Sequence, residues 1–600
     1  MRRVLFVALA ACSPAPPPLP PLPPIPLVTD VPAAPSRKPS SPAAVDPGVD
    51  VTALDKTADP CVDVYQFACG GWIAASAIPP DRARWSRTSD LEDHAQAALR
   101  DILDDAARGA DPATRRLGDF YAARLDDVGA DRAGLAALKP VLDKVLGVRD
   151  AASWQVAFGE LEKLGVPVVW SIDVAPDAKD PATNAVYLEP VEAYPRTLDG
   201  YRAHVGRMLA LAGVKVESAG ADVIAIESEL AKLAPEKREY APGDAAALRG
   251  LGVAKAAKIV LPAPKWLAQV DAVRAKFTFA QWSRYFAYEL LAALPLPKPF
   301  DDEQLELRKL VSGVEKQPER GKRCIAETAR ALGGELGALY AARHVSPASK
   351  LAAGQLVDAL VKAAGDGRPR LAQLQRLIGA PDSPPASDLD VRRGDYLGNV
   401  LRARGAAVKR RLALAGAPVD RAAWPVDAFA VHAVYDPALN RLVVPAGMLQ
   451  PPWFSPDRPI AANLGGLGVA LARELVRAAE LPQPACVAEQ VATFEALPRQ
   501  FLQSHRVAAE AAADLGGVEL AYRAYRASGG ADDAPFFVAV AQAACSRERP
   551  AETQRRLVTD SHAPALFRVY GSLRNMKEFA EAFRCAPGTP MRPAKTCSVW

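Results

Sequence analysis

Three residues in the C-terminal third of the sequence, Arg473, Glu474 and Arg477, have a spacing that is used in metal chemistry. In the helical motif His-Glu-x-x-His, two histidines one turn apart bind zinc and the adjacent glutamate acts as a general base. Here the glutamate is present, but arginine stands at both histidine positions. A guanidinium group stays protonated and offers only hydrogen-bond donors, so it has no lone pair for a metal ion. This stretch therefore contains the base of a zinc site without its two helical ligands.

Histidine is too sparse elsewhere to form a compact metal motif. No two of the six histidines lie within one helical turn of each other, so a metal site built on histidine would have to collect them from separate segments. They are His94, His204, His344, His432, His505 and His562. The simplest interpretation of Arg473 and Arg477 is then the solvated face of an amphipathic helix.

The segments around these residues indicate how they would be positioned. Residues 463–480 form a glycine-rich lead followed by a predicted helix. Residues 428–435 and 441–447 are strand-like and are separated by a turn at 436–440. A strand pair ahead of such a helix can frame a site in which the edge strand holds an extended peptide by main-chain hydrogen bonds. Further helices are expected over 506–516 and 522–527.

Composition favours a helical, multidomain protein. A length of 600 residues permits two or more domains with full cores. The net charge of +4 is small for this size and gives no reason to expect a nucleic-acid partner. Ala, Leu, Arg and Glu dominate long stretches, which favours helix. Helices are expected over residues 91–105, 151–164, 201–212, 221–233, 279–294 and 324–343, and a short hairpin over residues 168–174 and 185–188.

The start of the chain is typical of an exported lipoprotein. Residues 1–12 combine a basic start, a short apolar run and Leu-Ala-Ala-Cys12, which looks like a bacterial lipobox. The run is too short to span a bilayer. We expect cleavage before Cys12 and lipidation of that residue, which would attach the protein to a membrane; a plain signal peptide cut nearby is the alternative. Ser13 follows, which by analogy with bacterial sorting favours the outer membrane. Residues 13–55 are rich in proline and are expected to form an extended tether; the alternative is a docking ligand for a proline-binding domain.

Several motifs in order resemble the neprilysin family of zinc metallopeptidases, which includes endothelin-converting enzymes and bacterial oligopeptidases. The similarity runs from about residue 58 to Trp600. The motifs that carry it are Pro60-Cys-x-Asp-x-Tyr-x-x-x-Cys-Gly-Gly-Trp72, Val443-Val-Pro-Ala-Gly-Met-Leu-Gln-Pro-Pro-Trp-Phe454, residues 463–480, Glu510-Ala-Ala-Ala-Asp514, Asp560-Ser-His562 with Arg568, and the ending Cys597-Ser-Val-Trp600. Because the similarity is continuous on both sides of Arg473 and Arg477, it disfavours an ordinary solvated helix face.

The resemblance implies a role for each matching position. The two zinc-binding histidines of the family correspond to Arg473 and Arg477, and its glutamate ligand corresponds to Glu510. Its catalytic glutamate corresponds to Glu474, the partner aspartate to Asp514, and the histidine that stabilises the transition state to His562. Substrate-binding positions correspond to His432, where the family has asparagine, to Ala433 and to Arg568.

The resemblance also implies three disulfides, which suit an exported protein. They are Cys61–Cys585, Cys69–Cys545 and Cys486–Cys597. Cys324 matches a family cysteine whose usual partner is absent, so we expect a free, buried thiol.

These expectations combine into one description of the fold. It is mainly α with a small β-sheet (α+β), and its two lobes, a thermolysin-like lobe and a helical lid domain, enclose a central cavity. We assign residues 56–90 to an N-terminal segment on the catalytic-like lobe, 91–385 to the helical lid domain and 386–600 to a degenerate zinc-peptidase domain.

The expected function is that of a catalytically inactive homologue in the cell envelope, with no cofactor, which binds a peptide or a partner protein. The alternative is an active zinc endopeptidase that cleaves short peptides through an unusual metal site, for example one formed by His432, His562 and Glu510. In the inactive form, buried carboxylates without zinc would be costly. We therefore predict that Arg473 or Arg477 pairs with Glu510 or Asp514.

Overall fold

The computed structural model describes residues 48–109, 111–190, 199–233, 241–242, 258–261, 265–382, 387–493 and 505–600. The chain divides into two units, Met1–Pro42 and Ala43–Trp600, and everything described below lies in the second. The predicted signal peptide, Cys12 and most of the predicted tether lie outside the described residues. Residues 48–55, which we had included in the tether, are packed instead: Ala53 is buried and the carbonyl of Gly48 accepts a hydrogen bond from Arg458.

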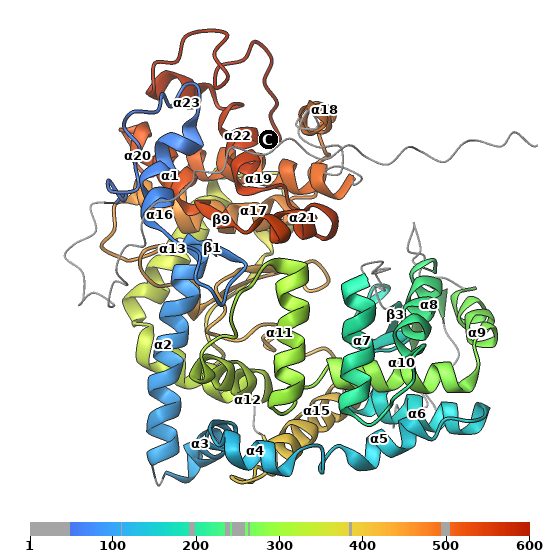
Figure 1. The fold of residues 1–600 in the computed structure, drawn as a ribbon. Helices are drawn as coiled ribbons and strands as arrows, with labels where there is room; N and C mark the ends of the chain where they lie inside the picture. Colours follow the sequence, from blue (N-terminus) through green and yellow to red (C-terminus); the bar gives the residue numbers. More distant parts are fainter. Residues whose placement is uncertain are drawn as a thin grey trace, which may run out of the picture. The chain divides into compact units, whose positions relative to one another are not determined.

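Two large hydrophobic cores organise the described chain (Figure 1). The first core lies among helices of the N-terminal two thirds and contains a cluster of aromatic rings in contact, Trp154, Phe158, Trp282 and Phe286. Its elements are α2 (Arg87–Arg108), α3 (Pro112–Leu125), α4 (Asp127–Ala133), α5 (Lys139–Leu146), α6 (Ala151–Lys163), β2 (Trp170–Asp177), β3 (Asp180–Pro190), α7 (Asp199–Leu211), α8 (Ala219–Ala231), β4 (Ala241–Pro242), β5 (Ile259–Leu261), α9 (Trp266–Lys276), α10 (Phe279–Ala292), α11 (Lys298–Ser312), α12 (Arg320–His344) and α15 (Tyr396–Ala413).

The remaining elements surround or flank the second core, which is closed by segments from both ends of the chain. They are α1 (Val64–Ala75), β1 (Arg84–Ser86), α13 (Pro347–Ala363), α14 (Pro369–Ala372), β6 (Gln375–Gly379), β7 (Val434–Asp436), β8 (Arg441–Pro445), η2 (Ala446–Met448), α16 (Ile460–Asn463), η3 (Leu464–Gly468), α17 (Val469–Ala478), α18 (Ala485–Thr493), α19 (His505–Ala527), α20 (Asp533–Ala543), β9 (Ser546–Glu548), α21 (Pro550–Thr559), α22 (Ala565–Leu573) and α23 (Lys577–Ala582).

Three small sheets complete the mainly α fold, which confirms the predicted fold class. β2 and β3 form the predicted hairpin and extend through β5 to β4. β1 pairs with β9, so a strand near the start of the described chain lies beside one near its end. The third sheet has the order β6–β8–β7, with β6 parallel and β7 antiparallel to β8.

The two cores do not follow the expected boundary near residue 385. α13 and β6, which we had placed in the lid, pack in the second core, and α15 packs in the first. Parallel pairing of β6 with β8 joins residues more than sixty positions apart, for which local sequence patterns give no signal. α2 contacts α3 at one end and α20 at the other, so it links the two sets of helices (Figure 1).

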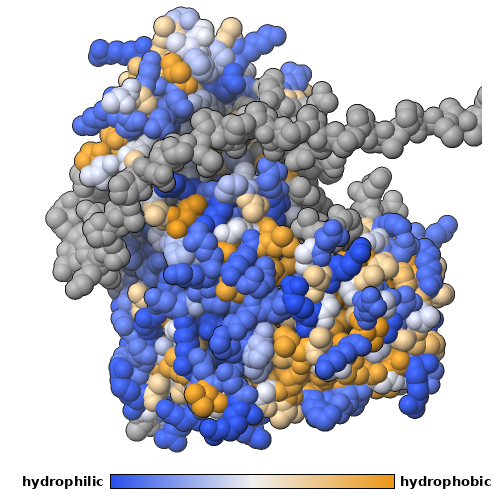
Figure 2. Space-filling model, in the orientation of Figure 1, coloured by the Kyte–Doolittle hydropathy of each residue, from blue (hydrophilic) through white to orange (hydrophobic). Residues whose placement is uncertain are grey.

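None of the described helices has both the length and the apolar character that a bilayer-spanning helix requires. The face shown in Figure 2 is largely hydrophilic, with an apolar area at the lower right, where Figure 1 places α5 to α7 and α10.

Glu162 on α6 is a buried carboxyl group whose ionisation should destabilise the first core. Among the described residues its side-chain Oε1 has no hydrogen-bond partner, and burial raises the pKa of Glu162 to about 8 although Arg411 partly opposes this. As the pH rises from about 4.5 to 8, the unfolded state loses this proton while the folded state keeps it, so stability falls. We expect Glu162→Gln to raise the free energy of unfolding by a few kcal/mol at pH 9, and by less at pH 6. Urea denaturation at both pH values measures this. The control is Glu160→Gln, a more exposed neighbour paired with Lys163; equal gains in both variants would contradict the prediction.

Candidate functional site

The residues with the zinc-motif spacing lie on α17, which follows directly from the glycine-rich π-turn η3. Leu471 and Leu475 are buried on one side of α17, which places Arg473, Glu474 and Arg477 on the other. A β-carbon at Gly465 would come within 2.6 Å of the carbonyl oxygen of Phe536. The glycine-rich lead therefore allows η3 to pack directly on the backbone of α20, which fixes the start of α17.

α19 supplies the carboxylates that face α17. It is one continuous helix that runs through Gly516-Gly517, whereas the sequence analysis expected separate helices over 506–516 and 522–527. The glycines serve helix packing instead. A β-carbon at Gly517 would come within 2.6 Å of the Arg473 side chain. This close approach brings Glu510 and Asp514, one turn apart on α19, against the arginines.

Five charged residues from the two helices form a connected ion-pair cluster. Arg473 contacts Glu510, with Nη2 3.2 Å from Oε2, and also pairs with Asp514 through Nε. Arg477 contacts the same Glu510 oxygen at 2.5 Å and pairs with Glu474. The predicted pairing of the arginines with Glu510 and Asp514 is confirmed.

Arg568 and His562 extend this cluster from the segment after α21. Arg568 on α22 donates two hydrogen bonds of 2.9 Å to the two carboxylate oxygens of Asp514. His562 lies between two carboxylates, with Nε2 3.1 Å from Glu510 and Nδ1 2.9 Å from Asp560. The sequence analysis named Asp560 in the motif Asp560-Ser-His562 but assigned it no role.

Burial and charge act against each other in this cluster. Burial alone would raise the pKa of Glu510, but the hydrogen bond from His562 and the charge of Arg477 lower it to about 2. Burial likewise opposes ionisation of Asp514, and Arg473 and Arg568 outweigh it and lower its pKa. Hydrogen bonds to Asp560 and Glu510 raise the pKa of His562. The carboxylates are therefore ionised at neutral pH, with their charge matched by arginine.

These side chains do not fit a zinc ion. The guanidinium groups of Arg473 and Arg477 lie at hydrogen-bond distance from Glu510 and offer no lone pair. Placing a dication beside them would add repulsion in a poorly solvated site. The displaced site of His432, His562 and Glu510 does not form: no group of three or more His, Cys, Asp or Glu side chains within the described ranges is arranged to hold a metal.

The edge strand is shorter than expected. Only Val434–Asp436 pair with β8, whereas we had predicted a strand over 428–435. Residues 427–430 form a turn instead, in which Ala430 N–H donates to the carbonyl of Asp427. The backbone N–H of Tyr435 donates to Glu474 Oε2 at 3.1 Å. Both oxygens of Glu474 are thus engaged, one by this N–H and the other by Arg477.

A cavity of about 260 Å³ lies beside the cluster and the edge strand. His432 is exposed and Ala433 half-buried, and both line the cavity together with Arg473, Glu474 and Arg568. Arg84 of β1 and Arg556 of α21 also line it, which the sequence analysis did not foresee, because they come from segments remote from the motif.

The three predicted disulfides are confirmed. Cys61–Cys585, Cys69–Cys545 and Cys486–Cys597 are all formed. Cys324 is free and buried in the first core, as expected. The first two disulfides link α1 and the residues just before it to the segments that follow α20 and α23. All of these segments pack in the second core.

The sequence matches known proteins over most of its length. Two family profiles described as peptidase family M13 match residues 60–367, and residues 432–480 with 481–599. Human endothelin-converting enzyme-like 1 is 26% identical over 672 residues, covering 91% of this chain and 85% of that protein. The structure of zinc metalloprotease Zmp1 from Mycobacterium tuberculosis in complex with an inhibitor has a TM-score of 0.81 at 26% identity, covering 93% of this chain and 100% of that one. PepO from Lactobacillus rhamnosis has the same fold, with a TM-score of 0.75 at 20% identity, covering 89% and 98%.

Proposed function

This chain belongs to peptidase family M13, a family of metallopeptidases, and we propose that it is an inactive member that binds peptides without cleaving them. The observation that carries the proposal is the ion-pair cluster in which Arg473 and Arg477 pair with Glu510, Glu474 and Asp514. By the resemblance, the two arginines stand where the family has zinc-binding histidines, and an arginine side chain cannot bind zinc. Two guanidinium groups replace the +2 charge of the ion.

The state of Glu474 supports the loss of catalysis. A general base takes up a proton less readily when a cation is paired with it, because the positive charge favours its ionised form. One Glu474 oxygen pairs with Arg477 and the other accepts the Tyr435 N–H. His562, between Glu510 and Asp560, is similarly engaged, so neither side chain is poised for the chemistry of its family position.

The features that would bind a peptide are retained, whereas those that would cleave it are not. β7 is an edge strand, and edge strands bind extended peptides by main-chain hydrogen bonds. The adjoining cavity offers apolar side chains such as Val431 and Val469 beside Arg568. We therefore infer a ligand that lies along β7 and places one side chain in this cavity.

The same proposal includes a location in the cell envelope. We infer that the chain is exported and anchored by lipid at Cys12, with the outer membrane as its site. The lipobox-like Leu-Ala-Ala-Cys12 supports this, and so do three disulfides, because such bonds persist in oxidising compartments.

Metal analysis combined with peptide assays tests the function. We expect the purified, oxidised protein to hold less than about one tenth of a zinc ion per chain. A peptide labelled at its N-terminus, fluorescein-Gly-Phe-Leu-Ala-amide, should bind saturably and remain intact with or without a chelator. Ala433→Trp, which fills the cavity, should weaken binding at least about tenfold, which corresponds to 1.4 kcal/mol.

The matched control is Ala438→Trp in the exposed turn before β8, which should bind the peptide as the wild type does. About one zinc per chain, with cleavage that a chelator abolishes, would overturn the loss of activity. An intact peptide that binds both tryptophan variants equally would overturn the position of the site.

A further inference from the structure

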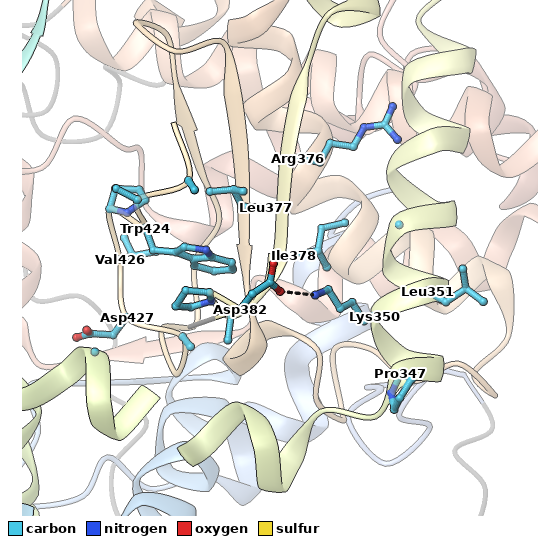
Figure 3. Close-up of a pocket in the computed structure, with 18 of the residues that line it drawn as sticks. Pro347, Lys350, Leu351, Arg376, Leu377, Ile378, Asp382, Trp424, Val426 and Asp427 are labelled. Atoms are coloured by element: carbon cyan, nitrogen blue, oxygen red, sulfur yellow. Dashed lines mark ion pairs between the residues drawn. The ribbon is translucent and has the colours of Figure 1, made fainter. Parts of the chain in front are cut away.

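A second groove lies on the opposite edge of the same sheet, about β6. It encloses about 1200 Å³ and is lined by α13, by β6 and by residues 420–428 (Figure 3). This volume exceeds the roughly 300–1,000 Å³ that is typical of small-molecule pockets. None of the family motifs found in the sequence contributes to its lining. The groove is therefore a candidate site separate from the one at β7.

β6 leaves one edge of its backbone unpaired. The sheet order is β6–β8–β7, so β6 has a neighbour on one side only. The N–H of Gln375 donates to the carbonyl of Asn440, which directs the backbone groups of alternate residues toward β8. Those of Arg376 and Ile378 then point to the free edge, and within the described residues they have no backbone partner. Such an edge is a template for another strand.

The two walls of the groove suit the alternating side chains of an added strand. On one side, Leu351 of α13 is 64% exposed and Ile378 of β6 lies against Gly354. On the other side, Figure 3 shows Trp424 and Val426 across the strand from Leu351. Side chains of an extended segment point alternately to opposite faces, so one set would meet α13 and the other set Trp424.

The charges of the groove favour a basic ligand. Arg376 pairs with Asp358, and Lys350 lies 4.0 Å from Asp382 (Figure 3). A further carboxylate of the lining, Asp420, has no ion-pair partner in the described parts of the chain. Asp427 points away from β6 and lies against Gly333 of α12 (Figure 3). The lining that faces β6 therefore carries one more carboxylate than cations.

We propose that the free edge of β6 binds an extended segment of a partner protein in which lysine or arginine alternates with apolar residues. Binding adds a strand beside β6 through the backbone of Arg376 and Ile378. The apolar residues of the segment pack on Trp424 and Leu351, and a cation of the segment approaches Asp420. The site is independent of the proposed peptide site at β7.

A pair of synthetic probes tests this inference on the intact, oxidised protein. Fluorescein-labelled acetyl-(Lys-Val)4-amide should bind saturably in an anisotropy titration, at least about tenfold more tightly than acetyl-(Glu-Val)4-amide. Hydrogen exchange should slow at the amides of Arg376 and Ile378 when the basic probe is bound. Ile378→Pro removes one of these N–H groups and is tolerated on an edge strand, so it should weaken binding about tenfold or more.

Charge variants distinguish binding of the basic probe in the groove from nonspecific electrostatic attraction to the protein surface. Asp420→Asn should weaken the basic probe several-fold, whereas Asp302→Asn, which makes the same charge change on exposed α11, should not. The inference is overturned if the basic probe fails to saturate at about 1 mM. Equal binding of the acidic probe, or protection at residues 431–436 in place of 375–379, would overturn it as well.

Discussion

A variant with histidine in place of both Arg473 and Arg477 is expected to bind about one zinc ion per chain, whereas the wild type retains less than about a tenth. Both arginine side chains already reach Glu510 from the same face of α17. Imidazoles one turn apart on this face would meet that carboxylate as a third ligand. Removal of two cations also leaves Glu510 and Asp514 in need of positive charge. Elemental analysis after dialysis with zinc, followed by metal-free buffer, measures the gain.

A third change provides the control for this variant. Glu510→Gln in the double-histidine background should release most of the zinc, because it removes a charged ligand while the two imidazoles remain. A folded double variant that retains no zinc would show that the site has diverged beyond the two arginines. Circular dichroism and urea denaturation establish that the variant is folded before its metal content is interpreted.

Asp514→Ala is expected to lower the free energy of unfolding by about 3–5 kcal/mol, the largest loss in the ion-pair cluster. The Asp514 side chain is only 8% exposed and contacts both Arg473 and Arg568. Its removal leaves two guanidinium groups facing each other in a poorly solvated site. Urea denaturation at pH 7 measures the change.

Asp302→Ala is the matched control for this prediction. Asp302 forms an exposed pair with Lys298 one turn earlier on α11, so its loss should cost less than about 0.5 kcal/mol. If Asp514→Ala cost as little as Asp302→Ala, the cluster would be well solvated and would not contribute to the stability of the second core.

The sequence predicted the parts of the site that depend on local pattern and on motif order. Arg473, Glu474 and Arg477 are recognisable by spacing alone, and the carboxylates Glu510 and Asp514 by their matching segment. The need to neutralise those carboxylates also predicted their arginine partners, because an unpaired buried charge is costly whatever the details of the fold.

What the sequence did not reveal depends on packing between remote segments. The Tyr435 N–H on Glu474 and the fork of Arg568 on Asp514 arise only once β7, α17, α19 and α22 are assembled. Gly516-Gly517 illustrates the ambiguity: the same dipeptide can break a helix or let another helix approach closely, and only the contact with Arg473 distinguishes the two. The free edge of β6 was hidden for the same reason.

The disulfides that close the second core also set an order of events during synthesis. Cys61 can form its disulfide only after Cys585 has been synthesised, and Cys69 only after Cys545. The beginning of the folded region therefore cannot be cross-linked until almost all of the chain has been made. Once both disulfides have formed in an oxidising compartment, they hold the two ends of the folded region together. A single protease cut anywhere between residues 70 and 544 would leave the two fragments joined, and they would separate on a gel only after reduction.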